Sequence, residues 1–369
     1  MNKRIWIEKR NTELDIVKGL AIIVVVSIHA QMPILKWLQL IQMQVFFIAS
    51  GFCYNPKASE SIENMKIYIM KRLKALYVPC FLWSLTVTLL HNEMVKISLI
   101  AGEIYSIKQM LMQIGKCVLF SGGGQLSGTI WFLRTMFGAS TLYMLLDQVS
   151  RNVTSRRLYR SIMCVVCLLL GWLAEVFSIP GQQYFNVFSV VFLYEIGRTI
   201  RDYKPRYLTP GSDKRESALS TVIIVFCSII FLYILKQVGG IAVNSNAIIN
   251  PIVFAASSIL GWILFVQLSF LMNRVKITVL VLSYLGKHTL PIMLFHFLSF
   301  KIITVLQLLL YQFDWEQLTS FPCLIIDNSW WIVYTICGVC MPLIFYEIYT
   351  FVKRKILKGP AKVRAAKSE

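Results

Sequence analysis

The sequence predicts an all-α fold, a polytopic membrane bundle of about ten transmembrane helices with both termini in the cytoplasm. Hydrophobic residues make up 57% of the 369 residues and charged residues only 15%, whereas soluble domains carry about 25% charged residues. Ten spans of about 20 residues would occupy roughly 200 positions. Little chain remains for a water-soluble catalytic domain, so any chemistry must lie in or beside the bilayer.

Ten apolar runs predict the spans, because each is rich in aliphatic and aromatic residues and poor in charge. The first five are Leu14 to Gln31, Trp37 to Tyr54, Leu76 to Leu90, Ile130 to Leu146 and Ile162 to Ile179. The other five are Tyr184 to Ile200, Ala218 to Leu235, Ile248 to Met272, Leu290 to Leu310 and Trp330 to Val352.

The formal net charge of +19 would suggest a nucleic-acid partner in a soluble chain. An even number of spans places both termini on one side, and 29 of the 37 Lys and Arg residues fall on that side. Basic residues concentrate on the cytoplasmic side of membrane proteins. We therefore expect cytoplasmic termini, contacts with anionic membrane lipids, and no nucleic acid.

The chain divides into one membrane domain and a short tail. We expect the domain to cover residues 1–352 and a basic cytoplasmic tail to cover 353–369. Within the domain, residues 97–128 form an outer segment in which Ile107, Leu111 and Val118 recur at helical spacing among polar residues. This pattern predicts a helix lying in the membrane interface, followed by a glycine-rich turn.

Charged and imidazole side chains inside spans are costly and therefore indicate candidate functional residues. Asp15, Lys18 and His29 fall on one face of the first span, since a step of 11 residues returns to within about 20° of register. His296 is the second histidine in the middle of a span. Helix-to-helix hydrogen bonding is the structural alternative for both histidines.

The nine cysteines do not indicate a metal site. Two C-x-x-C pairs, Cys164/Cys167 and Cys337/Cys340, lie within apolar runs, and no histidine accompanies either pair at ligand spacing. We therefore expect no metal and no metal-dependent chemistry.

Five blocks in order resemble the integral-membrane acyltransferase 3 family. They are LDIVKGLAIIVVVSIH (Leu14 to His29), FFIASGF (Phe46 to Phe52), YIMKRLKALYVP (Tyr68 to Pro79), TIWFL (Thr129 to Leu133) and LGKHTLPIMLFH (Leu285 to His296). The chain looks most like the sugar O-acetylases of the fucose 4-O-acetylase type. Many members carry Arg at the position of Lys18 and a second Arg where this chain has Ala75.

The resemblance implies an O-acyltransferase of the bacterial plasma membrane that moves an acyl group, usually acetyl from acetyl-CoA, onto a sugar hydroxyl of an envelope polysaccharide or its lipid-linked precursor. Coenzyme A is a polyanion, and Lys71, Arg72 and Lys74 lie on the expected cytoplasmic side, where they could bind its phosphates. Its pantetheine arm could then run along the face of Lys18 toward His29.

At the end of that path His29 is the candidate general base that removes the proton from the sugar hydroxyl. A covalent acyl-imidazole at His29 is an equally valid route. Candidate donors to the oxyanion are the Ser50 hydroxyl, the Trp131 indole N–H and the His296 imidazole.

Two other classes of protein remain open from the residues alone. A transporter or flippase of a glycan or lipid-linked intermediate would use His29 and His296 as proton-relay groups. A glycan polymerase is a third possibility. Transporters commonly show repeated halves and polymerases a large outer loop, and neither feature is clear in this sequence. A structural scaffold would not need an aligned polar face.

Overall fold

The structure is a computed structural model that describes residues 11–33, 36–122, 124–211, 217–239, 241–243, 245–248, 250–327 and 329–358. The basic N-terminal segment from Lys3 to Arg10 and residues 359–369 of the expected tail lie outside the described residues.

Across the described residues the regular secondary structure is helical apart from one short two-stranded ribbon. The helices are α1 (Thr12–His29), α2 (Gln44–Phe52), α3 (Ile62–Arg72), α4 (Val78–Leu89), α5 (His91–Lys96), α6 (Ile107–Val118), α7 (Ile130–Val149), α8 (Arg156–Val176), α9 (Asn186–Tyr203), α10 (Ala218–Val238), α11 (Pro251–Met272), α12 (Lys276–Lys287), α13 (Thr289–Tyr311) and α14 (Trp330–Lys358). Strands β1 (Ile241–Ala242) and β2 (Ala247–Ile248) pair antiparallel. A π-turn over Leu73–Tyr77 joins α3 to α4.

Each predicted apolar run contains an α-helix, although the run from Trp37 to Tyr54 is divided into a 3-10 helix over Lys36–Leu40 and the short α2, and the helices differ in their suitability to cross a bilayer. Among the described residues, five are long and apolar enough to do so by length and composition: α8, α10, α11, α13 and α14. Helix α2 has only nine residues, and α1 carries Glu13, Asp15 and Lys18. The sequence did not predict α12, a 12-residue helix that fills the expected loop before α13.

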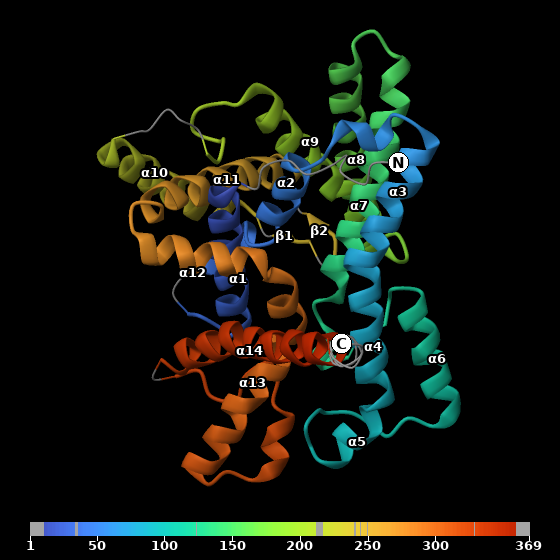
Figure 1. Cartoon of the computed structure of the whole chain (residues 1–369), viewed down its shortest axis with the longest axis vertical. Helices are drawn as coiled ribbons and strands as arrows, with labels where there is room; N and C mark the ends of the chain where they lie inside the picture. The colour runs from blue at the N-terminus through green and yellow to red at the C-terminus, as the bar shows by residue number, and fades with distance from the viewer. Residues whose placement is uncertain are drawn as a thin grey trace, which may run out of the picture.

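Helix α1 lies near the middle of the bundle, and α12 and α14 run across it (Figure 1). Two glycines allow α1 and α12 to touch. A Cβ atom built on Gly19 would lie 2.1 Å from the Leu282 carbonyl oxygen, and one on Gly286 would lie 1.8 Å from the Asp15 carbonyl oxygen. Small residues permit such backbone contact between membrane helices. The pair therefore fixes the end of α1 that carries Asp15.

A second reciprocal glycine contact joins α2 to α9. A Cβ on Gly51 would meet the Tyr194 carbonyl oxygen at 2.1 Å, and a Cβ on Gly197 would meet the Ile48 carbonyl oxygen at 2.0 Å. Gly51 belongs to the FFIASGF block. A glycine at this position lets the backbones of α2 and α9 pack closely. Helix α2 is thereby held against α9 along one side of the bundle.

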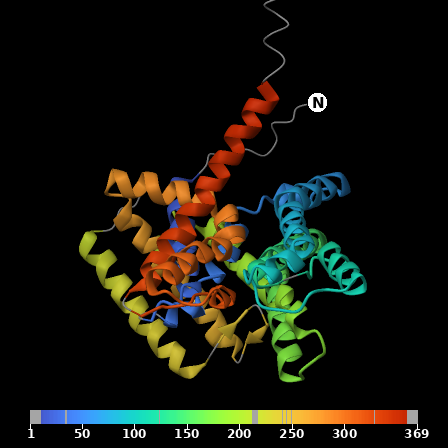
Figure 2. The same cartoon turned by 90° about the horizontal axis from the view of Figure 1, so that it is seen from below.

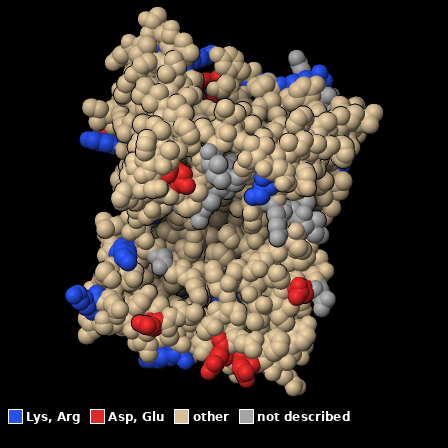
Figure 3. Space-filling model, turned by 180° about the vertical axis from the view of Figure 1, so that it is seen from behind, with Lys and Arg blue, Asp and Glu red and all other residues tan. Residues whose placement is uncertain are grey.

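Large apolar side chains cover much of the outer surface. On α10, Ile223, Phe226 and Tyr233 are each more than half exposed, which is expected for a helix in contact with lipid. Figure 3 shows a face on which uncharged atoms dominate and charged side chains are isolated. The far end of α14 projects away from the other helices (Figure 2). The chain is a membrane protein.

Helix α6 is present where the sequence predicts a helix in the outer segment. Ser106 and Gln109 form a capping box at its N-terminus, which supplies partners for two backbone N–H groups. Ile107 and Leu111 are 82% and 64% exposed. Helix α6 packs on α4 and leaves these apolar side chains exposed; its position at a membrane surface stays a prediction.

We predict that Gly286→Ala lowers stability because the new methyl group forces α12 away from α1. The expected cost is about 1–3 kcal/mol, the usual range for overpacking. The melting temperature of the purified protein in detergent measures it. Gly115→Ala in α6 is the matched control, since a Cβ there meets no atom within 4 Å. Equal melting temperatures for the two variants would contradict the close contact.

Candidate active site

Two histidines distant in sequence meet at the centre of the candidate site. His29 is the last residue of α1 and His296 lies in the first half of α13. Their ring centroids are 5.2 Å apart, and the Phe297 ring lies 4.9 Å from His29 and 4.2 Å from His296. His296 is fully buried, whereas His29 is half-buried. His29 is therefore the more exposed residue of the pair.

The hydrogen bonds of His296 fix which of its nitrogens is available. Its Nδ1 lies 3.0 Å from the carbonyl oxygens of both Ile292 and Met293. Carbonyls only accept, so Nδ1 carries the proton and Nε2 the lone pair. Nε2 is buried and has no hydrogen-bond partner among the described residues. An unpaired buried acceptor is costly, which marks this nitrogen as a place for a ligand.

A second part of the site is a cavity of about 230 Å³ beside Lys18, named here the Lys18 cavity. Lys18 Nζ forms an ion pair with Asp15 Oδ1 at 2.7 Å, as the i,i+3 spacing predicts. Lys18 is a quarter exposed and Asp15 is buried. The walls of the cavity come from α1, α2, α7, α13 and the turn before α4, and include Phe46, Ser50, Leu76, Phe132 and Met293.

The Lys18 cavity and the histidine pair are neighbours along two helices. Lys18 and His29 lie on α1 with about 16.5 Å of helical rise between them. On α13, Met293 lines the cavity, and its carbonyl oxygen accepts the hydrogen bond from His296. The cavity thus reaches within one helical turn of the buried imidazole.

The basic cluster predicted to bind the donor directly precedes two residues of the cavity wall in the sequence. Lys71 and Lys74 are exposed. Arg72 is half-buried, with its guanidinium 5.1 Å from the centre of the Tyr68 ring. One helical turn further on, Ala75 and Leu76 line the Lys18 cavity. These cations are therefore close in sequence to the wall of the cavity.

The structure separates the candidate oxyanion donors. Ser50 lines the Lys18 cavity, and its hydroxyl lies 3.7 Å from the Met136 sulfur. Trp131 lines a different cavity of about 340 Å³ together with Arg134 and the glycine-rich turn. Of the three candidates, His296 is the one whose ring contacts His29.

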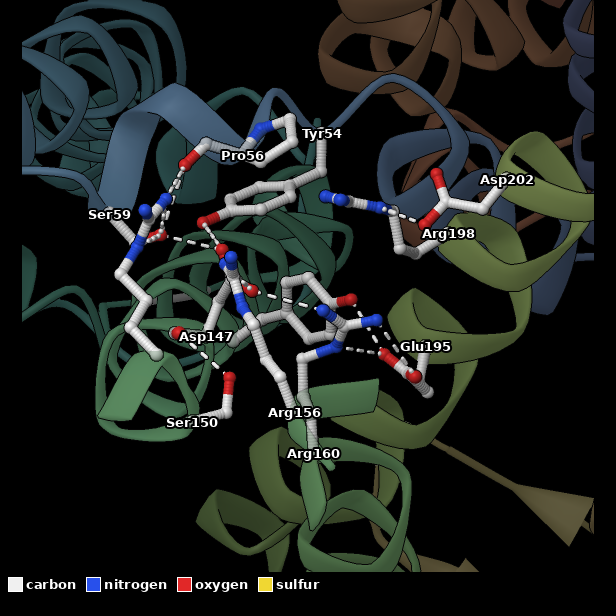
Figure 4. Close-up of polar contacts among 12 residues, drawn as sticks. Tyr54, Pro56, Ser59, Asp147, Ser150, Arg156, Arg160, Glu195, Arg198 and Asp202 are labelled. Atoms are coloured by element: carbon white, nitrogen blue, oxygen red, sulfur yellow. Dashed lines mark hydrogen bonds and ion pairs between the residues drawn. The ribbon is translucent and has the colours of Figure 1, made fainter. Parts of the chain in front are cut away.

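Sequence reasoning missed a buried network of charges where α7, α8 and α9 meet (Figure 4). Asp147 is fully buried and accepts hydrogen bonds from Tyr54, Ser59, Arg156 and Arg160. The members of this network run from Tyr54 to Glu195, a span of more than 140 residues, and show no shared spacing in the sequence. Only folding brings them together.

A second carboxylate completes this network. Glu195 accepts two hydrogen bonds from the Arg160 guanidinium at 2.7 and 3.2 Å, and others from Tyr143 and Ser161. Arg160 therefore bridges two carboxylates, and its ion pairs with both are buried. The network joins α7, α8 and α9, the last of which packs on α2.

These features define an integral-membrane protein in which a pair of imidazoles lies near a largely apolar cavity that contains one lysine, an arrangement suited to group transfer. Residues 11–347 match the acyltransferase 3 family model, described as an acyltransferase domain. The match covers most of the chain, which therefore belongs to this family and is an acyltransferase. No curated protein and no solved structure matches the chain.

We predict that Asp147→Ala destabilises the protein by about 3–5 kcal/mol, because it leaves buried guanidinium and hydroxyl donors without their acceptor. Thermal unfolding in detergent measures the loss. Glu93→Ala is the control, since its ion pair with Lys96 is mostly exposed and such pairs contribute about 0–1 kcal/mol. A small loss for Asp147→Ala would show that the network does not support the fold.

Proposed function

We propose that this acyltransferase transfers an acyl group, most simply acetyl from acetyl-CoA, to a sugar hydroxyl of an envelope polysaccharide or its lipid-linked precursor. The single observation that carries the proposal is the pair of His29 and the buried, unpaired Nε2 of His296 next to the Lys18 cavity. Neutral imidazoles are suited to proton transfer from a hydroxyl near pH 7.

The proposed reaction is direct transfer with general-base catalysis. His29 accepts the proton of the sugar hydroxyl as its oxygen attacks the thioester carbonyl. The tetrahedral intermediate then collapses, the carbon–sulfur bond breaks, and the leaving coenzyme A thiolate takes the proton from the His29 imidazolium. A two-step route through an acyl-imidazole at His29 uses the same residues.

His296 is proposed to act as a hydrogen-bond acceptor beside His29. Its Nδ1–H faces two backbone carbonyls, so the nitrogen left for the site carries a lone pair. Such a nitrogen accepts a hydrogen bond from the sugar hydroxyl or from a ring N–H of His29. It does not donate to an oxyanion in this tautomer, which leaves that role to another donor, such as Ser50, or to a water.

The donor is proposed to enter from the cytoplasm. Lys71, Arg72 and Lys74 bind the phosphates of coenzyme A, and the pantetheine arm runs through the Lys18 cavity toward the histidines. The exposure of two of these cations and the nearness of Ala75 and Leu76 to the cavity support this path. No metal takes part in the proposed reaction.

The proposed setting is the bacterial plasma membrane, with about ten spans, both termini in the cytoplasm, residues 1–352 as the membrane domain and residues 353–369 as a basic tail. The excess of Lys and Arg on that side supports this topology and favours contact with anionic lipid head groups. The acceptor then reaches the histidines from the opposite side, past the outer segment of residues 97–128.

We predict that His29→Gln lowers acetyl transfer by roughly 100-fold or more, because glutamine keeps a polar group but removes the base. Membranes incubated with labelled acetyl-CoA and the envelope glycan fraction measure it, at matched protein abundance. Wild-type transfer by His29→Gln would refute the assignment. In the absence of acceptor, acid-labile label retained on the wild-type protein and lost in His29→Gln would select the acyl-histidine route.

We predict that Lys71→Gln, Arg72→Gln and Lys74→Gln each weaken acetyl-CoA binding by roughly tenfold, the usual effect of losing one charge-assisted hydrogen bond. Titration of the purified protein in proteoliposomes measures the affinity. Lys96→Gln is the control, because Lys96 pairs with Glu93 on α5. If all four variants bound acetyl-CoA as the wild type does, the donor site would have to lie elsewhere.

A further inference from the structure

Lys301 is a buried cation that the proposed mechanism does not use. It lies on α13, five residues after His296, and is 3% exposed. Its Nζ donates to the carbonyl oxygens of Leu318 and Ser320 at 2.6 and 2.9 Å. Among the described residues it has no ion-pair partner. Burying an ammonium group costs free energy. The two hydrogen bonds to backbone carbonyls must offset that cost.

The same stretch of backbone is bound at a second point. Gln307, two turns along α13, donates to the Ile325 carbonyl oxygen at 3.1 Å and accepts from the Ile325 N–H at 3.2 Å. The Tyr334 hydroxyl of α14 accepts from the Leu324 N–H at 3.1 Å and donates to Gln307. The buried side chains of Lys301, Gln307 and Tyr334 thus form hydrogen bonds to the backbone of a single segment between α13 and α14.

We name this segment, Trp315 to Ile325, the cap. It contacts the surroundings of the histidine pair at two places, the Phe297 ring and the backbone of His29. The Phe321 ring lies 4.8 Å from the Phe297 ring, which itself contacts both imidazoles. The Cys323 thiol lies 3.9 Å from the His29 carbonyl oxygen. Phe321 and Cys323 lie within five positions of Leu318 and Ser320, whose carbonyl oxygens bind Lys301.

We propose that Lys301 is a positioning residue for acyl transfer, which holds the cap over the histidine pair. The proposal rests on the proposed catalytic role of that pair. Lys301 sets the position of Leu318 and Ser320, and the cap in turn places Phe321 and Cys323 against Phe297 and His29. A displaced cap would open the histidines to water and loosen the wall against which an acceptor packs.

Two substitutions of Lys301 separate the effect of its charge and hydrogen bonds from the effect of its size. Methionine matches the length of lysine but donates no hydrogen bond, so Lys301→Met frees both carbonyls while still filling space. Arginine keeps the charge and supplies several donors in a wider group. Lys301→Arg should therefore restore much of what Lys301→Met loses.

The first test follows the cap without any activity assay. Cys323 is 7% exposed, so it is shielded while the cap is closed. In purified protein treated with N-ethylmaleimide and digested for peptide mass spectrometry, we expect Lys301→Met to label Cys323 about tenfold faster than wild type, through local opening. Lys301→Arg should label it at close to the wild-type rate.

Cys164 of α8 provides the internal control, because it is fully buried and distant from the cap in sequence. It should stay unlabelled in every variant, whereas general unfolding would expose both thiols. An unchanged rate at Cys323 in Lys301→Met, or equal exposure of Cys323 and Cys164, would overturn the proposal.

The second test concerns the reaction. We expect Lys301→Met to raise the KM for the glycan acceptor and lower kcat while the KM for acetyl-CoA stays unchanged. Asp147→Asn serves as a variant of lowered stability outside the site, and it should leave both KM values unchanged. Equal effects of the two substitutions would mean that Lys301 only supports the fold. If the wild type transferred no acetyl group, the thiol labelling would still decide whether Lys301 holds the cap.

Discussion

The backbone contact between α1 and α12 is the constraint on which the site depends. Gly19 and Gly286 each occupy a place where a single added carbon would overlap a carbonyl oxygen of the other helix. Helix α1 carries Asp15, Lys18 and His29, so its depth and rotation decide where the Lys18 cavity ends and which way His29 faces. A rigid α1 is needed because an imidazole displaced by about 1 Å loses much of its catalytic value.

Polar groups inside this apolar bundle are satisfied in three different ways. Asp15 and Lys18 neutralise each other within one helix. Arg160 bridges two carboxylates from α7 and α9, and Lys301 binds backbone carbonyls of a loop. Burial without a partner is costly in each case. Nε2 of His296 is one of ten buried side-chain polar atoms that have no hydrogen-bond partner among the described residues, and it lies at the proposed reacting centre.

The sequence predicts the parts of this arrangement that depend on local periodicity. Each of the ten apolar runs contains a helix, although the second is divided; Asp15 pairs with Lys18, and the spacing of Ile107 and Leu111 marks α6. Helix α12 was missed because its apolar stretch is too short to resemble a span. The Asp147 network and the hydrogen bonds from Lys301 to the cap were missed for a different reason. Their partners come from separate elements. Lys301 binds backbone carbonyl oxygens, and because every residue has one, no sequence pattern marks them.

Helix α13 unites the features that a transfer reaction across this site would need. Its first turn lines the Lys18 cavity, its second turn presents His296, and the following turns carry Phe297, Lys301 and Gln307. A single helix of 23 residues therefore determines the separation between cavity, imidazole and cap. Because its hydrogen-bonded backbone keeps that separation fixed, a donor in the cavity and an acceptor beneath the cap would meet at the histidine pair without either end having to move.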